Sequence, residues 1–155
     1  MSTTTLDEFW QAYLATLPPE QLPPARCPAW YFGDSPELAN ELGDLVLAGR
    51  KSATCTLLAE FEHEHEPLPE PGERAVITRF DGQPLCIIAT TGVEVLPFEA
   101  VNADFAYAEG EGDRSLASWR REHTRYFTRR CAQLGLKFSP DMLVVCERFR
   151  RIYPP

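Results

Sequence analysis

The change of hydrophobic period around residues 49–54, which read Gly-Arg-Lys-Ser-Ala-Thr, constrains the fold of this chain more than any other feature. Over residues 38–46, apolar side chains recur every three or four positions, which is the spacing of an amphipathic helix. Ser35 offers an N-cap for this helix, and Gly49 tolerates the left-handed conformation that often follows a last turn. The sequence therefore predicts a helix that delivers Lys51 to a defined place just beyond its end.

From residue 53 onwards the pattern alternates with a period of two, which predicts a strand with Thr54 and Thr56 on one face. The alternation continues to His63 and His65, so we expect the strand to run that far. Two histidines on one strand face are able to share a metal ion. A solvated edge strand is the alternative, and we favour it because glutamates surround the two histidines.

Lys51 and Thr54 allow two interpretations from their spacing alone. In the first, Lys51 offsets the negative end of the helix dipole and lies in solvent. In the second, the two residues form a base and nucleophile pair at the mouth of a barrel. A lysine can take the proton of a threonine hydroxyl only when desolvation lowers the pKa of its amine. The second interpretation therefore requires Lys51 to be partly buried.

Helical and strand patterns alternate irregularly along the rest of the chain. Helices are predicted over 5–17 and 115–134, strands over 74–80, 85–95 and 142–153, and a short helix or loop over 97–107. An Asp-Gly pair at 81–82 predicts an antiparallel hairpin. Without regular β-α-β alternation, this order indicates the α+β class with a small curled sheet or barrel.

We expect one domain over residues 1–155, in which 1–27 form an N-terminal helix and a proline-rich connector too short to separate domains. No apolar run is long enough to span a bilayer, and the first residues lack the features of a signal peptide. A cytoplasmic protein without membrane contact is expected. Its five scattered cysteines contain no C-x-x-C pair, so we expect them to be reduced and mostly buried.

The acidic run at residues 109–113, Glu-Gly-Glu-Gly-Asp, precedes the long helix predicted from residue 115. In one interpretation Asp113 or Ser115 caps that helix and the glycines only make the turn. In the other, the glycines let the backbone approach a ligand while one carboxylate points into a cleft. His123 lies on the apolar side of the helix, where a hydrogen-bonded core role is favoured over catalysis.

Residues 49–54 resemble the G-x-K-x-x-T signature of the ASCH domain family. Other segments resemble the larger ASCH proteins of the bacterial YhfF-like type, in the same order along the chain: residues 30–34, the helix that runs to 48, and residues 84–88, 95–98 and 109–120. The resemblance spans about residues 28–153. It implies a PUA-like β-barrel, mixed and mostly antiparallel, with flanking α-helices and a cleft associated with RNA or nucleosides.

Two activities are implied by this resemblance. One is amide hydrolysis of N4-acetylcytidine to cytidine and acetate by a lysine, a threonine and a glutamate, which match Lys51, Thr54 and Glu111, with Glu109 as the second choice. The other is cleavage of single-stranded RNA, in which Lys51 would steady the charge on phosphorus. The small hydrolases carry an arginine two residues after the threonine, whereas this chain has Thr56 there. A binding module without turnover is the third hypothesis.

The implied substrate-binding residues are Glu109, Ser115, Tyr31, Arg50 and Trp119. Tyr31 belongs to an aromatic cluster with two alternative roles, packing in the core or stacking on a base. No metal and no cofactor is expected. The formal net charge of −8 repels phosphate backbones at long range, despite the arginines between residues 120 and 130. We therefore favour a small uncharged nucleoside over long RNA, with no DNA partner, and we expect a monomer or a homodimer.

Overall fold

The computed structural model describes residues 4–155, so residues 1–3 of the predicted N-terminal segment lie outside the described part. The helices are α1 (Leu6–Leu14), α2 (Pro36–Leu47), α3 (Leu58–Glu64), α4 (Ala103–Glu109) and α5 (Leu116–Gln133), with short 3-10 turns η1 (Pro19–Gln21) and η2 (Phe98–Ala100). The strands are β1 (Ala29–Trp30), β2 (Ala53–Leu57), β3 (Arg74–Thr78), β4 (Pro84–Pro97) and β5 (Leu143–Tyr153).

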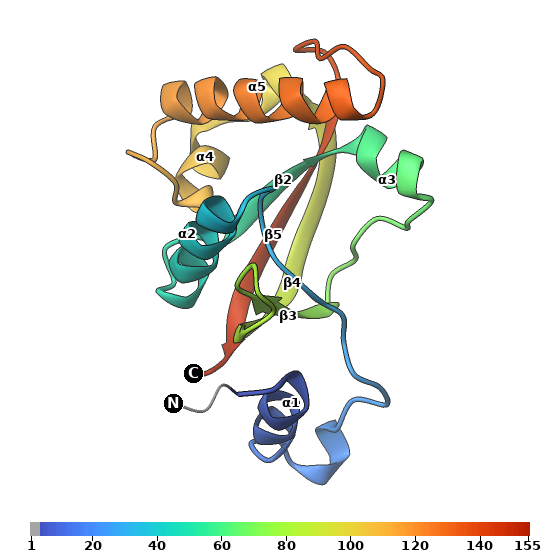
Figure 1. Cartoon of the computed structure of the whole chain (residues 1–155), viewed down its shortest axis with the longest axis vertical. Coiled ribbons are helices and arrows are strands. Elements are labelled where there is room, and N and C mark those ends of the chain that lie inside the picture. Colours follow the sequence, from blue (N-terminus) through green and yellow to red (C-terminus); the bar gives the residue numbers. More distant parts are fainter. Residues whose placement is uncertain (1–3) are drawn as a thin grey trace.

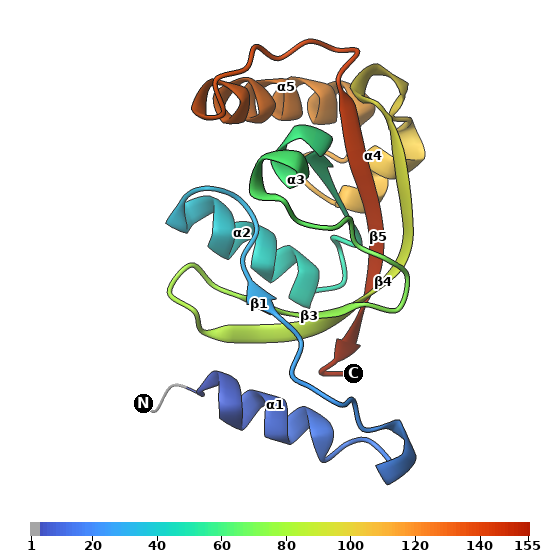
Figure 2. The same ribbon diagram turned by 90° about the vertical axis from the view of Figure 1, so that its right-hand side faces the viewer.

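The strands form one mixed sheet in the order β1-β3-β4-β5-β2. Every neighbouring pair is antiparallel except β1 with β3, which is parallel. The long strands β4 and β5 curl together through the molecule, with α5 across one end and α1 across the other (Figures 1 and 2). The predicted α+β class with a mostly antiparallel sheet and flanking helices is confirmed, and the sheet is barrel-like but open because β1 and β2 remain its two edges.

Helix α2 begins and ends where its sequence predicts. The Ser35 hydroxyl accepts the Leu38 N–H, and Pro36 occupies the first helical position. At the other end Gly49 has φ +79°, its N–H donates to the Val46 carbonyl, and the Arg50 N–H donates to the Leu45 carbonyl. These two bonds form a Schellman motif, which satisfies the last carbonyls of the helix and turns the chain sharply toward β2.

The prediction that the strand continues to His65 is wrong. Strand β2 ends at Leu57, and the following residues form α3, which ends with His65 at φ 56°. Residues 58–61 contain leucine, alanine and glutamate, which suit a helix, and Arg130 of α5 anchors α3 through bonds of 2.8 and 2.7 Å to Glu60. His63 and His65 are therefore exposed and do not share a strand face.

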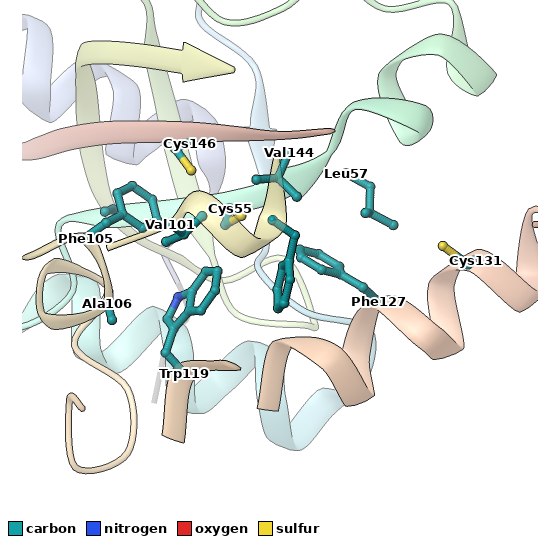
Figure 3. Packing of buried hydrophobic residues seen from close by; sticks show 12 residues of the cluster. Cys55, Leu57, Val101, Phe105, Ala106, Trp119, Phe127, Cys131, Val144 and Cys146 are labelled. Atoms are coloured by element: carbon teal, nitrogen blue, oxygen red, sulfur yellow. The ribbon is translucent and has the colours of Figure 1, made fainter. Parts of the chain in front are cut away.

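The two faces of the sheet are covered by different helices. One face packs against α4 and α5, and Figure 3 shows Trp119 and Phe127 of α5 beside Cys55 and Val144 of the strands. The other face packs against α2 through a second cluster that includes Phe32 and Val46. Alternate residues of β2 therefore serve different surroundings: Cys55 lies in the first core, whereas its neighbour Thr54 is only half-buried on the opposite side.

Helix α1 lays its apolar side on the body, as predicted, and buries Trp10 and Tyr13 against Val76 and Ile87. It is shorter than predicted at its C-terminal end, where Pro18 and Pro19 follow. All five cysteines are free, and each of them except Cys27 is buried. Within residues 4–155, no helix combines the length and the apolar character that crossing a membrane requires.

Candidate active site

Lys51 is buried, with 2% of its surface exposed, so the interpretation that places it in solvent is wrong. The Schellman turn at Gly49 reverses the chain, and the Lys51 N–H still bonds to the Leu45 carbonyl at 3.1 Å. The side chain therefore leaves the end of α2 inward. Its ammonium group lies 5.3 Å from the centre of the Phe32 ring, which covers it on one side.

The segment around Lys51 is tied directly to the acidic run. The Ser52 N–H donates to the Ala108 carbonyl at 2.8 Å, and the Arg50 guanidinium donates to the carbonyls of Gly110 and Gly112 at 2.8 and 3.0 Å. A Cβ on Gly110 would lie 2.7 Å from the carbonyl carbon of Arg50 and closer still to its oxygen. Only glycine fits there, because the two backbones are in contact and its φ is +72°.

Three acceptors surround the Lys51 ammonium group. Nζ lies 2.8 Å from the Ala53 carbonyl, 3.0 Å from Glu109 Oε1 and 2.9 Å from Glu111 Oε2, so each of its three protons has an acceptor. Burial lowers the pKa of Lys51, but the charges of Glu109 and Glu111 raise it by more, and the pKa ends above its ordinary value. Lys51 is therefore a cation, and the lowered pKa that a lysine base needs is not found.

Glu109 is the inner carboxylate, with 1% of its surface exposed. Its second oxygen accepts the indole N–H of Trp119 and lies 3.0 Å from His123 Nε2. Burial opposes ionisation of Glu109, but the charges of His123 and Lys51 and these hydrogen bonds hold its pKa well below the usual range. Glu109 is thus a fixed anion whose oxygens are both engaged.

His123 contributes a second cation to this group. Its Nδ1 lies 2.9 Å from the Trp119 carbonyl, and its Nε2 faces the Glu109 carboxylate. Both partners are acceptors, so both ring nitrogens carry a proton. Burial lowers the pKa of His123, but Glu109 raises it further, and the net pKa is above the ordinary value. The predicted hydrogen-bonded core role is confirmed, with the addition that the bond is an ion pair at a cavity wall.

Glu111 is the outer carboxylate, and 29% of its side chain is exposed. Burial raises its pKa, Lys51 lowers it, and the neighbouring Glu109 charge raises it again, so the net pKa is above the ordinary value. Of the two glutamates, only Glu111 combines exposure with a raised pKa, which suits a group that gives and takes protons.

A cavity of about 900 Å³ opens beside these groups. Of the predicted site residues it is lined by Lys51, Thr54, Glu109, Glu111 and Tyr31, and Thr56 also faces it. Tyr31 is 41% exposed and lies 5.0 Å from the Phe80 ring, so it is a rim residue and not a core residue.

The other predicted substrate-binding residues lie outside the cavity wall and support residues that line it. Ser115 caps α5 by accepting the Ser118 N–H, as the capping interpretation predicts. Arg50 is exposed and holds the 110–112 loop, while Trp119 is buried and holds Glu109. None of the three lines the cavity in the described part of the chain, so the geometry gives them supporting positions.

The cavity wall is strongly acidic. Nine glutamates contribute to it, at positions 41, 60, 64, 66, 73, 109, 111, 122 and 147, against the four cations Lys51, Arg74, Arg125 and Arg129, besides His123. No local sequence pattern predicts this acidic wall, because the nine glutamates come from separate helices, strands and loops. Such a wall disfavours a polyanionic ligand and admits an uncharged or cationic one.

The donor atoms of Glu109, Glu111 and His123 lie within 4.8 Å of one another, close enough to be considered as metal ligands. The chemistry of the donors fits protons better than a metal. Lys51 bridges the two carboxylates, and both nitrogens of His123 face acceptors and carry protons. A metal at this position would have to displace these protons and bind beside an ammonium ion.

The chain shows clear similarity to known families and structures. The family model described as ASCH domain matches residues 28–153. The crystal structure of an ASCH domain from Lactobacillus crispatus JV V101 is 38% identical, with a TM-score of 0.87 over 95% of this chain and 93% of that one. The crystal structure of protein EF3133 from Enterococcus faecalis V583 is 41% identical, with a TM-score of 0.85 over 95% and 87%. No curated protein matches the chain.

A more distant similarity concerns the fold alone. Hypothetical protein PH0355 is 13% identical, with a TM-score of 0.53 over 82% of this chain and 100% of that one. The ASCH structures have the PUA-like fold, so the predicted PUA-like architecture is confirmed, in its open form.

Proposed function

Because this chain belongs to the ASCH domain family, in which RNA-binding and hydrolase-like proteins occur, we propose that it is a hydrolase of a modified nucleoside and that its reaction is the amide hydrolysis of N4-acetylcytidine. The observation that carries the proposal is the Nζ–Oε2 contact of 2.9 Å between Lys51 and Glu111 in the cavity that Thr54 also lines. The three residues that the family resemblance implies all line this cavity, although sixty residues separate Lys51 from Glu111.

The roles follow from the charge state of each group. Thr54 is the nucleophile, because its hydroxyl is on the cavity face of β2 and half-buried. Glu111, with its raised pKa, protonates the leaving N4 amine and later takes a proton from water. Lys51 remains protonated, holds Glu111 in place and supplies a positive charge near the developing oxyanion. Glu109 binds the Lys51 ammonium group, and His123 in turn binds Glu109, so these two residues keep the lysine in position.

The acidic wall supports a nucleoside over RNA. A nucleoside carries no phosphate, whereas each phosphate of an RNA chain would approach a surface with nine glutamates. Two arginines of α5 that would offset this charge are engaged in ion pairs: Arg129 binds Asp34 with two bonds of 2.8 and 3.1 Å, and Arg130 binds Glu60. A cytoplasmic protein acting on free nucleosides is consistent with both features.

Cytidine release from N4-acetylcytidine is the direct test. We expect turnover by the wild type near neutral pH and none above background for Thr54→Ala, while Thr91→Ala, at an exposed threonine of β4, keeps full activity. A parallel incubation with single-stranded RNA distinguishes the alternatives. No cytidine from the wild type would refute the hydrolase proposal, RNA cleavage that disappears in Lys51→Ala would favour a ribonuclease, and nucleoside binding without either product would favour a binding module.

A further inference from the structure

Glu147 lies directly opposite Thr54 in the sheet. Strands β2 and β5 are antiparallel, and their register pairs Thr54 with Glu147. Residues paired in this way point to the same face, with Cβ atoms roughly 4.5–5.5 Å apart. Both side chains are half-buried and line the same cavity. The carboxylate and the Thr54 side chain are therefore neighbours on one face of the sheet.

The Glu147 side chain is held in place from a third strand. Thr90 of β4 donates its hydroxyl proton to Glu147 Oε2 at 2.6 Å, which leaves Oε1 without a bond to another protein side chain in the described chain. The charged and titratable groups that act on Glu147 are few. Burial raises its pKa, the Thr90 hydrogen bond lowers it, and the charge of Glu73, just before β3, raises it again, so the net pKa is above the ordinary value. Arg74 lines the same cavity.

The proton of Thr54 has no acceptor among the other site residues. Lys51 already carries three protons, each facing an acceptor. Both oxygens of Glu109 are bonded and the side chain is buried. Glu111 is needed in its protonated form at the moment of attack, because it must give a proton to the leaving amine. A separate base is required, and it must lie beside Thr54.

We propose that Glu147 is a further catalytic residue, the general base that takes the proton from the Thr54 hydroxyl; this inference rests on the proposed hydrolase function. Thr90 is its positioning residue. The reaction then requires opposite starting states of two carboxyl groups: Glu147, on the sheet side of the cavity, must be ionised, and Glu111, on the side of α4, must carry a proton. Thr54 lies on β2, between the strand of the base and the loop of the acid.

The steps balance in protons and electrons. The Thr54 proton moves to Glu147 as the threonine oxygen bonds to the acetyl carbon and the carbonyl pair moves onto its oxygen. Collapse of this intermediate breaks the carbon–N4 bond, and N4 takes the proton of Glu111, which releases cytidine. Water then attacks acetyl-Thr54 and gives a proton to Glu111. The second collapse returns the Glu147 proton to Thr54 and releases acetic acid.

The experiment uses p-nitrophenyl acetate as an acetyl donor that needs no nucleoside site. The rate of acetyl transfer to Thr54 is measured by mass spectrometry as a function of pH, with Thr54→Ala as the background. In the wild type the rate should rise as Glu147 loses its proton, with a midpoint above the ordinary range of a glutamate. Glu147→Gln should lower the rate about a hundredfold and remove this rise. The exposed strand residue Glu94 supplies the control, and Glu94→Gln should match the wild type.

Two further variants separate a base from a structural role. Thr90→Val removes the bond that favours the ionised carboxylate, so the midpoint should move to higher pH. Glu73→Gln removes a repelling charge, so the midpoint should move to lower pH. A change in packing alone would not produce opposite shifts.

The outcomes distinguish the inference from the function on which it rests. Acetylation of Thr54 that depends on Glu147, without any turnover of N4-acetylcytidine, would support the base and refute the proposed substrate. Turnover of N4-acetylcytidine that is unchanged within about twofold in Glu147→Gln would support the hydrolase and overturn the base. A wild type whose Thr54 is not acetylated, or is acetylated at the same rate in Glu147→Gln, also overturns the inference.

Discussion

Replacing Lys51 with methionine tests whether its buried charge holds the site together. The substitution keeps the length and the apolar stem of the side chain but removes the cation between Glu109 and Glu111. Breaking a buried ion pair by removing one partner costs about 3–5 kcal/mol, because the remaining charges stay buried without compensation. Here two carboxylates and the Ala53 carbonyl lose their donor, although His123 still compensates Glu109. We expect a loss of about 4 kcal/mol in the free energy of unfolding.

The stability of Lys51→Met should also depend on pH in a definite direction. Without Lys51, the charges of Glu109 and Glu111 repel each other, and protonation of Glu111 relieves the repulsion. The variant should therefore gain stability as the pH falls from 7 to 5. In the wild type the Lys51 charge lowers the pKa of Glu111 and so reduces this gain. The lowered pKa of Glu109 acts in the opposite sense, because its contribution to stability is present above the unfolded pKa and is lost as the pH falls through the folded one.

Urea denaturation at pH 7 and pH 5 measures both effects. Lys137→Met is the matched control, because Lys137 is the only other lysine of the chain and is exposed. The double variant Lys51→Met with Glu111→Gln should recover part of the loss at pH 7. A Lys51→Met protein within about 1 kcal/mol of the wild type at pH 7 would refute the reasoning, because exposed pairs contribute no more than that.

The remaining predictions concern the contacts that support this group. Gly110→Ala should move the Arg50 backbone and abolish nucleoside turnover, since the new Cβ has no room; full activity with an unchanged melting temperature would contradict the close contact. Trp119→Phe should cost about 1–3 kcal/mol in a urea titration, because Glu109 loses a buried donor, and a neutral result would speak against that bond. The raised pKa of His123 contributes stability that is fully present below pH ~6.5 and is lost as the pH rises through the pKa of the folded state. His123→Gln should remove this part of the pH dependence of the melting temperature. An unchanged pH profile of the melting temperature would mean that His123 is neutral.

Local signals explain which parts of the fold are predictable. The cap of α2, its end at Gly49 and the hairpin between β3 and β4 depend on residues a few positions apart, and the structure confirms each prediction. Helix α3 was missed because the alternating pattern of residues 58–65 is short, and the anchor that favours a helix there comes from Arg130, seventy residues away. A short apolar pattern does not by itself distinguish a strand from a helix.

For the candidate site, the family resemblance selected Lys51, Thr54 and Glu111 from the sequence, and spacing alone would have left Lys51 in solvent. The resemblance could not give the charge states. The pKa of Lys51 depends on two carboxylates brought to it by bonds between residues 50–52 and 108–112, and its direction is opposite to that expected from burial alone. No motif pointed to Glu147, because its pairing with Thr54 is a matter of strand register across the sheet.

By itself the sequence determined the elements whose hydrogen bonds join residues a few positions apart. It also determined that a lysine and a threonine lie where a helix ends and a strand begins. Only the tertiary structure decided which carboxylates bind that lysine, and that the pKa of the inner glutamate is lowered whereas that of the outer one is raised. It also decided that a glutamate of β5 is paired with the threonine. The physical reason is that burial and charge act through space. Glu109 and Glu111, which lie 58 and 60 residues away along the chain, raise the pKa of Lys51, and His123 of α5 together with Lys51 lowers the pKa of Glu109.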